Sequence, residues 1–334
     1  MRRVSRVTTA VLAAAMASGL AVAAVPASSS ATSAAVTPAA TPALKPATFN
    51  IASFNVLGAS HTLNGARGMA SGATRIVRAN QLLERHAVDV AGFQEMQASQ
   101  LTKFLSITNG AWAVYPGLSI KKIDSENSIG WRTDKFSLVQ ATTVKIPYFN
   151  GNPRRMPLVL LRDKASGMLA YFANYHNPAD TARYHHQAKW RAEANRVQIA
   201  LQKQIWTRGI PRFVTGDMNE RAPYFCRLAT EAPLIAARPN TYVKNGACYA
   251  NKPRAVDWIL GARKVSFSNY DEDRSHLVDI TTDHPVISTT VTVDPTRLPR
   301  AWRGSASARR SGPPSGWAVP GSASSPTARP GPRR

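Results

Sequence analysis

The sequence predicts a layered α+β domain, in which two β-sheets pack together and helices cover their outer faces. Three observations indicate this fold class. Short apolar runs typical of strands are frequent, whereas periodic helical patterns are few. Polar residues follow several of the strand-like runs, and no repeat of solenoid length is present. Two packed sheets with outer helices satisfy this pattern, because every sheet must bury at least one face.

The expected elements follow one another along residues 48–293. The expected strands cover 48–56, 88–95, 158–161, 168–173, 212–215, 255–260 and 286–293. Residues 128–131 and 136–139 are expected to form a hairpin across a turn at 133–135. A helix is expected near 74–85, with Ile76, Ala79, Leu82 and Leu83 on one face. The longest helical pattern covers 181–206.

Both ends of the chain differ in composition from a folded domain. Residues 1–26 combine a basic start with an uncharged, Ala-rich run, which is the pattern of a secretory signal peptide. An uncleaved membrane anchor is the alternative, because the run is about as long as a membrane span. Residues 27–47 predict a disordered linker, and the Pro-, Gly-, Ser- and Arg-rich residues 294–334 predict a disordered basic tail. We therefore expect a secreted protein with one folded domain over 48–293.

The net charge of the 334-residue chain is +23, and about +12 of it remains on residues 48–293 when both ends are set aside. Such a field attracts polyanions, such as nucleic acid, an anionic membrane or a teichoic-type polymer.

The chain has two cysteines, Cys226 and Cys248. An isolated pair in an exported protein usually forms a bridge, so we expect a disulfide between them. No Cys/His spacing of the zinc-binding type is present in the sequence.

Residues 213–220, FVTGDMNE, contain the clearest catalytic candidate. A short apolar run delivers Asp217 and Asn219 to the end of a strand, and Gly216 lets the backbone turn tightly there. Asp217 can accept a proton or position a water, and Asn219 can donate to a phosphate oxygen. For this stretch alone, an ordinary Asx-type turn is the alternative.

The same arrangement, a strand followed by polar side chains, recurs along the chain. In order, these residues are Asn55, Glu95, His176 with Asn177, Asp217 with Asn219, Asp257, and Asp283 with His284. Each could by itself be a turn or cap residue. Their repeated position at strand ends predicts that they share one site.

This set of motifs resembles the endonuclease/exonuclease/phosphatase superfamily, which includes deoxyribonuclease I, exonuclease III and the sphingomyelinases. The resemblance spans nearly all of 48–293. It rests on FNV at 54–56, QE at 94–95, YHN at 175–177, GDMN at 216–219, VDWIL at 256–260 and TDHP at 282–285. Thr282 stands where the family usually has serine, and it keeps the hydroxyl. The resemblance implies a four-layer α/β/β/α sandwich of two mainly antiparallel sheets packed face to face, and we expect a monomer.

The resemblance also implies a metal site. Glu95, helped by Asn55 and with Asp283 close by, would bind a divalent cation. Oxygen ligands without cysteine suit Mg²⁺ or Mn²⁺.

It implies catalytic and phosphate-binding roles as well. Asp257 would orient His284, and Asp217 would position and deprotonate the attacking water. Asn219 and His176 would hold phosphoryl oxygens, and His176 is placed to protonate the leaving oxygen. Further phosphate contacts are expected from Arg155 and Asn177, and Glu126 is a candidate for the acid that supports the catalytic histidine.

The expected function is divalent-metal-dependent hydrolysis of a phosphodiester, with DNA or RNA as the expected substrate. The basic pairs 121–122 and 154–155 and the Arg-rich tail favour nucleic acid. A phospholipid phosphodiesterase of sphingomyelinase type is the main alternative, with Tyr148 and Phe149 as candidates for membrane contact. A phosphomonoesterase and a non-catalytic basic binding protein are further alternatives, although a binder needs no base, metal ligand and His–Asp pair together.

Overall fold

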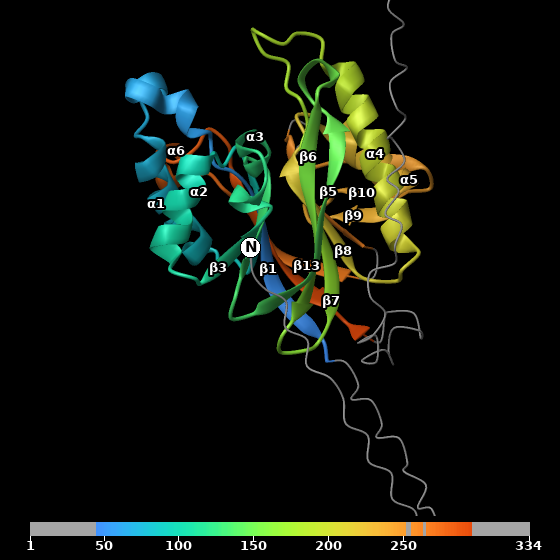
Figure 1. The fold of residues 1–334 in the computed structure, drawn as a ribbon. Helices are drawn as coiled ribbons and strands as arrows, with labels where there is room; N and C mark the ends of the chain where they lie inside the picture. Colours follow the sequence, from blue (N-terminus) through green and yellow to red (C-terminus); the bar gives the residue numbers. More distant parts are fainter. Residues whose placement is uncertain (1–44, 252–254, 263–264, 296–334) are drawn as a thin grey trace, which may run out of the picture. The chain divides into compact units, whose positions relative to one another are not determined.

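The computed structural model describes residues 45–251, 255–262 and 265–295, which contain two six-stranded sheets (Figure 1). In spatial order, sheet A consists of β13 (Val265–Asp273), β14 (Val286–Val293), β1 (Ala47–Asn55), β2 (Val90–Gln94), β4 (Ser128–Arg132) and β3 (Trp112–Tyr115). Sheet B consists of β5 (Phe136–Pro147), β6 (Pro153–Asp163), β7 (Leu169–His176), β8 (Arg212–Asp217), β12 (Asp257–Ala262) and β9 (Leu234–Ala236). Only β1–β2 and β7–β8 pair in parallel among the sheet pairings of the described residues.

Helices cover the outer face of each sheet. Helices α1 (Gly72–Arg85) and α2 (Ala98–Thr108) pack on sheet A, and α4 (Ala188–Trp206) and α5 (Ala222–Glu231) pack on sheet B. The shorter helices are α3 (Lys122–Ser125), α6 (His276–Asp279), η1 (Ala59–Gly68), η2 (Gly117–Ser119) and η3 (Phe149–Gly151). The predicted four-layer α/β/β/α sandwich is therefore confirmed. Across the described parts of the chain, no helix is both long and apolar enough to cross a membrane.

The two sheets bury an aromatic cluster between them. The rings of Phe49, Phe172 and Phe213 lie 5.2 to 5.8 Å apart, measured between centroids. Such packing supplies both apolar burial and specific ring geometry, so it fixes how one sheet lies on the other. On the outer side of sheet A, the four α1 residues predicted to share a face are all buried.

The predicted hairpin over 128–139 is wrong. Strand β4 pairs with β2 and β3 in sheet A, whereas β5 pairs with β6 in sheet B. Trp131 and Phe136 are both buried between the sheets, so the turn between them carries the chain from one sheet to the other. An apolar run reveals burial but not the sheet to which a strand belongs.

The predicted long helix begins later than expected, at Ala188. The preceding residues form an irregular loop that Asp180 ties down: its carboxylate accepts the Gln187 N–H at 2.6 Å and pairs with Arg191 at 2.7 Å.

The predicted disulfide is confirmed. It links Cys226 in α5 to Cys248 in β11 (Ala247–Tyr249), which pairs with β10 (Tyr242–Lys244) in a separate small hairpin. The predicted signal peptide and nearly all of the predicted linker and tail lie outside the described residues.

Strand direction explains why distant motifs meet. The carboxyl ends of β1, β2, β7 and β8 lie at one edge of the sandwich, and β12 and β14 begin there because they run antiparallel to their neighbours. In the register of β12 with β8, Asp257 stands opposite Asp217.

Candidate active site

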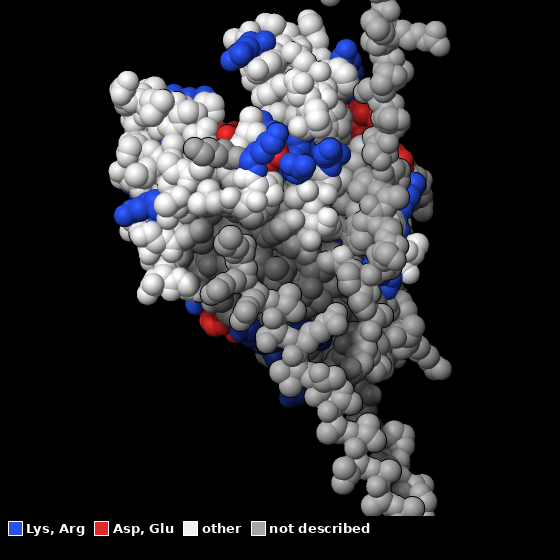
Figure 2. Space-filling model, viewed as in Figure 1, with Lys and Arg blue, Asp and Glu red and all other residues white. Residues whose placement is uncertain are grey.

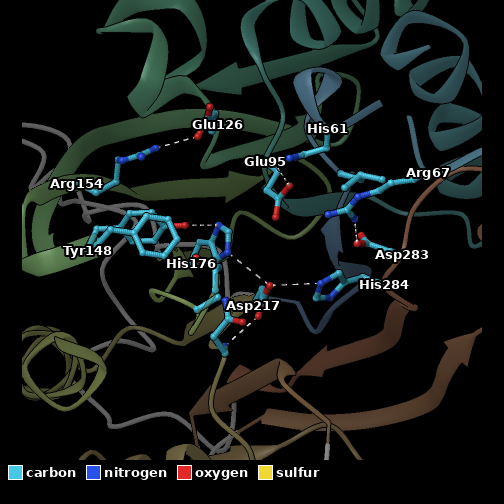
Figure 3. A pocket seen from close by; sticks show the side chains of 15 residues that line it. His61, Arg67, Glu95, Glu126, Tyr148, Arg154, His176, Asp217, Asp283 and His284 are labelled. Atoms are coloured by element: carbon cyan, nitrogen blue, oxygen red, sulfur yellow. Dashed lines mark hydrogen bonds and ion pairs between the residues drawn. The ribbon is translucent and has the colours of Figure 1, made fainter. Parts of the chain in front are cut away.

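A pocket of about 270 Å³ opens at this edge, between the ends of the two sheets (Figure 3). Its lining includes six residues that the sequence predicts to be catalytic or metal-binding: Glu95, His176, Asp217, Asn219, Asp283 and His284. The lining also includes Glu126, Tyr148, Phe149 and Arg154, together with His61 and Arg67, which the sequence does not predict.

Sheet A supplies the residues predicted to bind metal. Asn55 is buried at the end of β1, and its amide nitrogen donates to Glu95 at 3.0 Å and to Asp217 at 3.2 Å. Glu95 follows β2 with a positive φ of 59°, which turns its side chain into the pocket. Asp283 lies in the loop before β14 and pairs with Arg67 at 2.6 Å.

The surroundings of Glu95 keep it ionised. Burial raises the pKa of Glu95, but the nearby His176, the Asn55 amide and the Gly58 N–H together hold that pKa below its ordinary value. A carboxylate in this state is ready to bind a cation.

Sheet B supplies the residues predicted to move protons. Asp217, 1% exposed, accepts the Asn219 backbone N–H at 2.9 Å and lies 3.5 Å from His176 Nε2 and 3.6 Å from His284 Nε2. Asn219 donates its amide to the Asn177 carbonyl at 2.9 Å. Asp217 therefore accepts hydrogen bonds from Asn55 and Asn219 and lies beside a nitrogen of each histidine at the bottom of the pocket.

The half-buried His284 and the buried Asp257 form a pair that joins the two sheets. His284 Nδ1 lies 3.1 and 3.2 Å from the two Asp257 oxygens, which leaves Nε2 directed at the pocket. Burial lowers the pKa of His284, but Asp257, with Asp217 and Asp283, outweighs burial and raises that pKa to about 10. His284 is therefore a cation at neutral pH.

His176 has a different partner from the one expected. Its Nδ1 lies 3.3 Å from the hydroxyl of Tyr148, and burial raises the pKa of Tyr148 above its usual range, so the partner is a neutral phenol. The candidate acid Glu126 instead pairs with Arg154 at 2.9 Å. The Arg154 guanidinium lies 4.7 Å from the centre of the Tyr148 ring.

Two predicted phosphate contacts are not in the pocket. Arg155 pairs with Asp124 on the other face of β6, and its neighbour Arg154 lines the pocket instead. Alternation of side chains along a strand makes only one of the two face the site. The Asn177 side chain is buried against α4, where it donates to Asn195 and accepts from Gln198.

Two pocket residues of η1, His61 and Arg67, are not predicted from the sequence. His61 lies 3.4 Å from Glu95, and Arg67 contacts Asp283 across 216 residues of sequence. The segment has no strand or helix periodicity, and only its Gly-rich, polar composition between two elements marks it as a functional loop.

The donor set fits a hard divalent cation. Glu95 and Asp283 offer carboxylate oxygens to one pocket, where Glu95 lies beside His61 and Asp283 pairs with Arg67. Oxygen ligands of this kind suit Mg²⁺ or Mn²⁺. Asp217, Asp257 and His284 also have ligand atoms within 4.8 Å of one another. In that group the His284–Asp257 hydrogen bond already uses Nδ1, which favours an acid–base role.

No protein-family sequence model matches the chain, and no curated protein matches it in sequence. Solved structures do match its fold. An endonuclease/exonuclease/phosphatase family protein from Bacteroides thetaiotaomicron shares 19% identity at a TM-score of 0.57, over 75% of this chain and 99% of that one. The B. thetaiotaomicron mannosyl-6-phosphatase Bt3783 shares 19% identity at 0.56, over 73% and 99%. D. rerio TDP2 complexed with a single-strand DNA product shares 16% identity at 0.53, over 73% and 99%.

The chain therefore has the fold of the endonuclease/exonuclease/phosphatase proteins, as its motifs predicted. At these identities the likeness defines the fold, and the substrate must be argued from the pocket.

Proposed function

We propose that this protein is a secreted, divalent-metal-dependent phosphodiester hydrolase that acts on nucleic acid. The observation that carries the proposal is the convergence of Asp217, His176 and the His284–Asp257 pair on the pocket that also contains Glu95 and Asp283. Phosphodiester hydrolysis needs a base for water and donors for the phosphoryl oxygens, and these residue types meet both needs.

Each residue has a distinct proposed task. Asp217 accepts the proton of the attacking water, since it is buried and its carboxylate is held by donors on two sides. The cationic His284 donates from Nε2 to a phosphoryl oxygen, with Asp257 holding the ring in place. Asn219 supports the phosphate, and His176 delivers a proton to the leaving oxygen. A divalent cation held by Glu95, Asp283 and Asn55 would stabilise negative charge that develops on the phosphoryl group.

The aromatic residues near the pocket support nucleic acid over membrane lipid. Tyr148 is 7% exposed, and Phe149 stacks on Tyr184 with ring centroids 4.3 Å apart. These rings are packed into the protein, whereas a membrane anchor presents apolar side chains to the lipid. The cationic side chains of Arg67 and Arg154 on opposite sides of the pocket suit an anionic substrate.

A panel of substrates tests the proposal. Purified protein is incubated with plasmid DNA, RNA, bis(p-nitrophenyl) phosphate, sphingomyelin and mannose 6-phosphate, each with Mg²⁺ and with chelator. We expect metal-dependent cleavage of a nucleic acid and of the small diester. Cleavage of only sphingomyelin or only the monoester would contradict nucleic acid as the substrate. Full activity in chelator would contradict the proposed metal dependence.

A further inference from the structure

Three cationic residues outside the pocket, Lys121, Lys145 and Arg155, belong to neighbouring elements, and we call this group the basic ridge. Lys121 precedes α3, Lys145 is on β5, and Arg155 is on β6. Figure 2 shows Lys and Arg side chains gathered where β5 and β6 meet α3.

The arrangement of the basic ridge carries an electrostatic cost. Lys145 and Arg155 stand directly opposite each other in the antiparallel pairing of β5 with β6. Like charges in this position destabilise a sheet. Asp124 offsets part of the cost, because it accepts the Arg155 backbone N–H at 3.1 Å and lies 3.6 Å from the guanidinium. Lys121 and Lys145 are exposed.

Helix α3 contacts both the basic ridge and a residue of the pocket. Arg154, the neighbour of Arg155, lines the pocket and also donates to the Ile123 carbonyl of α3 at 2.7 Å. A chain of phosphates that leaves the pocket past Arg154 and α3 would reach the basic ridge on the opposite face of β6.

We propose that the basic ridge binds the phosphodiester backbone of a polynucleotide beyond the nucleotide held in the pocket. The inference rests on the proposed function for its choice of polymer. A bound polyanion would relieve the repulsion between Lys145 and Arg155 and release counterions, which is the usual source of sequence-independent affinity. A lysine on an edge strand such as β5 also hinders aggregation, but that purpose needs no arginine opposite it.

An anionic membrane is the competing partner. Leu118 and Ile123 are 49% and 53% exposed and flank Lys121 in sequence. Single exposed apolar side chains are common on soluble surfaces, and these two are small beside an amphipathic membrane-binding face. Their exposure therefore does not favour a membrane as the partner.

The test compares two double variants that each remove two positive charges. The ridge variant is Lys121→Gln/Lys145→Gln, which leaves Arg155 paired with Asp124. The control variant is Arg162→Gln/Lys164→Gln, which changes one exposed residue at the far end of β6 and one just after it. Binding of a fluorescein-labelled single-stranded 20-mer is measured by anisotropy in chelator at several salt concentrations. Hydrolysis of bis(p-nitrophenyl) phosphate is measured in Mg²⁺.

We expect the ridge variant to bind the oligonucleotide about 10-fold more weakly near 0.1 M salt and to lose roughly 1.5 from the log–log salt slope. The control variant should stay within about 2-fold. The small diester is too short to reach the basic ridge, so its hydrolysis should be equal in all three proteins. Equal oligonucleotide binding by the two variants would overturn the proposal.

Two further outcomes separate this proposal from the proposed function. If the protein binds the oligonucleotide through the basic ridge but hydrolyses no diester, the binding role of the ridge stands and the proposed hydrolase activity is wrong. A second outcome is diester hydrolysis without oligonucleotide binding, combined with binding to phosphatidylglycerol vesicles that Ile123→Ser abolishes. The hydrolase activity would then stand, and the partner of the ridge would be a membrane and not a polynucleotide.

Discussion

At the scale of single residues, the two histidines of the pocket differ in their partners. His284 bonds to a buried carboxylate, and His176 bonds to a buried phenol. The carboxylate stabilises a positive charge on its imidazole, whereas the phenol only orients the ring. We therefore expect different consequences when each partner is removed.

Asp257 and His284 should act as a unit. His284→Ala and Asp257→Ala are each expected to lower kcat/KM for a phosphodiester by about 10²-fold or more. The double variant should be little worse than the worse single variant, because residues that serve one function are not additive. Steady-state kinetics of all three proteins in Mg²⁺ measure this. Losses that multiply would show that Asp257 does not work through His284.

Tyr148→Phe should have a smaller effect. It removes one hydrogen bond to His176 and keeps the ring beneath Arg154, so we expect kcat to fall roughly 5- to 10-fold with little change in KM, as for the loss of about 1 kcal/mol. Tyr242→Phe, on the remote β10 strand, is the matched control. A kcat for Tyr148→Phe equal to that of the control would mean that the phenol does not position His176.

The pKa of His284 predicts a pH-dependent stability. A pKa raised from 6.5 to about 10 in the folded state gives stability that is complete below about pH 6.5 and is lost as the pH rises through about 10. The difference in Tm between wild type and His284→Asn should therefore shrink across that window. Thermal melts between pH 6 and pH 10.5 measure it, and a constant difference would contradict a charged His284.

At the scale of the elements, the seam between the sheets is polar directly behind the site. Asn174 of β7 donates to the Phe93 carbonyl at 2.7 Å and accepts from Gln94 at 2.6 Å, and Thr215 of β8 bonds to Asn174 at 3.1 Å. Sheet A approaches this network closely at Gly92, where an added Cβ would lie 1.9 Å from Thr215 Oγ1.

Gly92→Ala should therefore destabilise the fold by about 1–3 kcal/mol or more, as overpacking in a core does. Adding Thr215→Ala should restore part of the loss, because it removes the atom with the closest contact. Urea unfolding of the two singles and the double measures the coupling. If the losses of unfolding free energy are simply additive, the contact between residue 92 and Thr215 is not the cause of the destabilisation.

The disulfide belongs to the same scale, since it ties α5 to the β10–β11 hairpin. Its cysteines are 22 residues apart, and a loop of that size predicts a contribution of about 3 kcal/mol. Cys226→Ser/Cys248→Ser should lower Tm by roughly 10 °C, and small-diester hydrolysis at a temperature well below the new Tm should be retained. An unchanged Tm would contradict the predicted stabilisation by the disulfide. A variant that is folded but inactive would show that the site depends on the β10–β11 hairpin.

The sequence predicted those site residues that lie at the ends of apolar strands. It did not predict which face of a strand a given side chain occupies. Glu95, Asp217 and His284 each follow or precede an apolar run, and the strands bring them to one edge. Side chains alternate between the two faces of β6, so only one of Arg154 and Arg155 can face the pocket. The sequence does not show which one, because the two residues are adjacent and identical. Tyr148 was invisible as a partner of His176, because its contact depends on how the β5–β6 connection folds over the site.

At the scale of the molecule, the two halves of the site belong to different sheets. The residues predicted to bind metal, Asn55, Glu95 and Asp283, come from sheet A, and His176, Asp217 and Asp257 come from sheet B. The bonds Asn55–Asp217 and His284–Asp257 cross between the sheets. Correct packing of one sheet on the other is therefore a condition for the proposed catalysis, and the aromatic cluster between them indirectly sets the geometry of the site.

This division predicts how a cation should affect the whole fold. A ligand that binds only the folded state stabilises it by about 2.7 kcal/mol at a concentration of 100 Kd. For a domain of this size, that corresponds to a rise in Tm of roughly 5–10 °C. Mg²⁺ should produce such a rise, and NaCl at matched ionic strength should not. Glu95→Gln should abolish the rise, because it removes a carboxylate that lines the pocket.

Glu84→Gln on α1 is the matched control, since Glu84 is exposed, lies outside the pocket and carries the same charge. It should keep the full response to Mg²⁺. Differential scanning fluorimetry of the three proteins against Mg²⁺ concentration reads this out without any substrate, so it tests the cation site independently of the proposed activity. An equal rise in Glu95→Gln and wild type would place the cation away from Glu95. The Asp217–Asp257–His284 group would then be the next candidate for the cation site. A rise in Tm that is lost in Asp217→Asn but kept in Glu95→Gln would show that the cation binds this group and not Glu95.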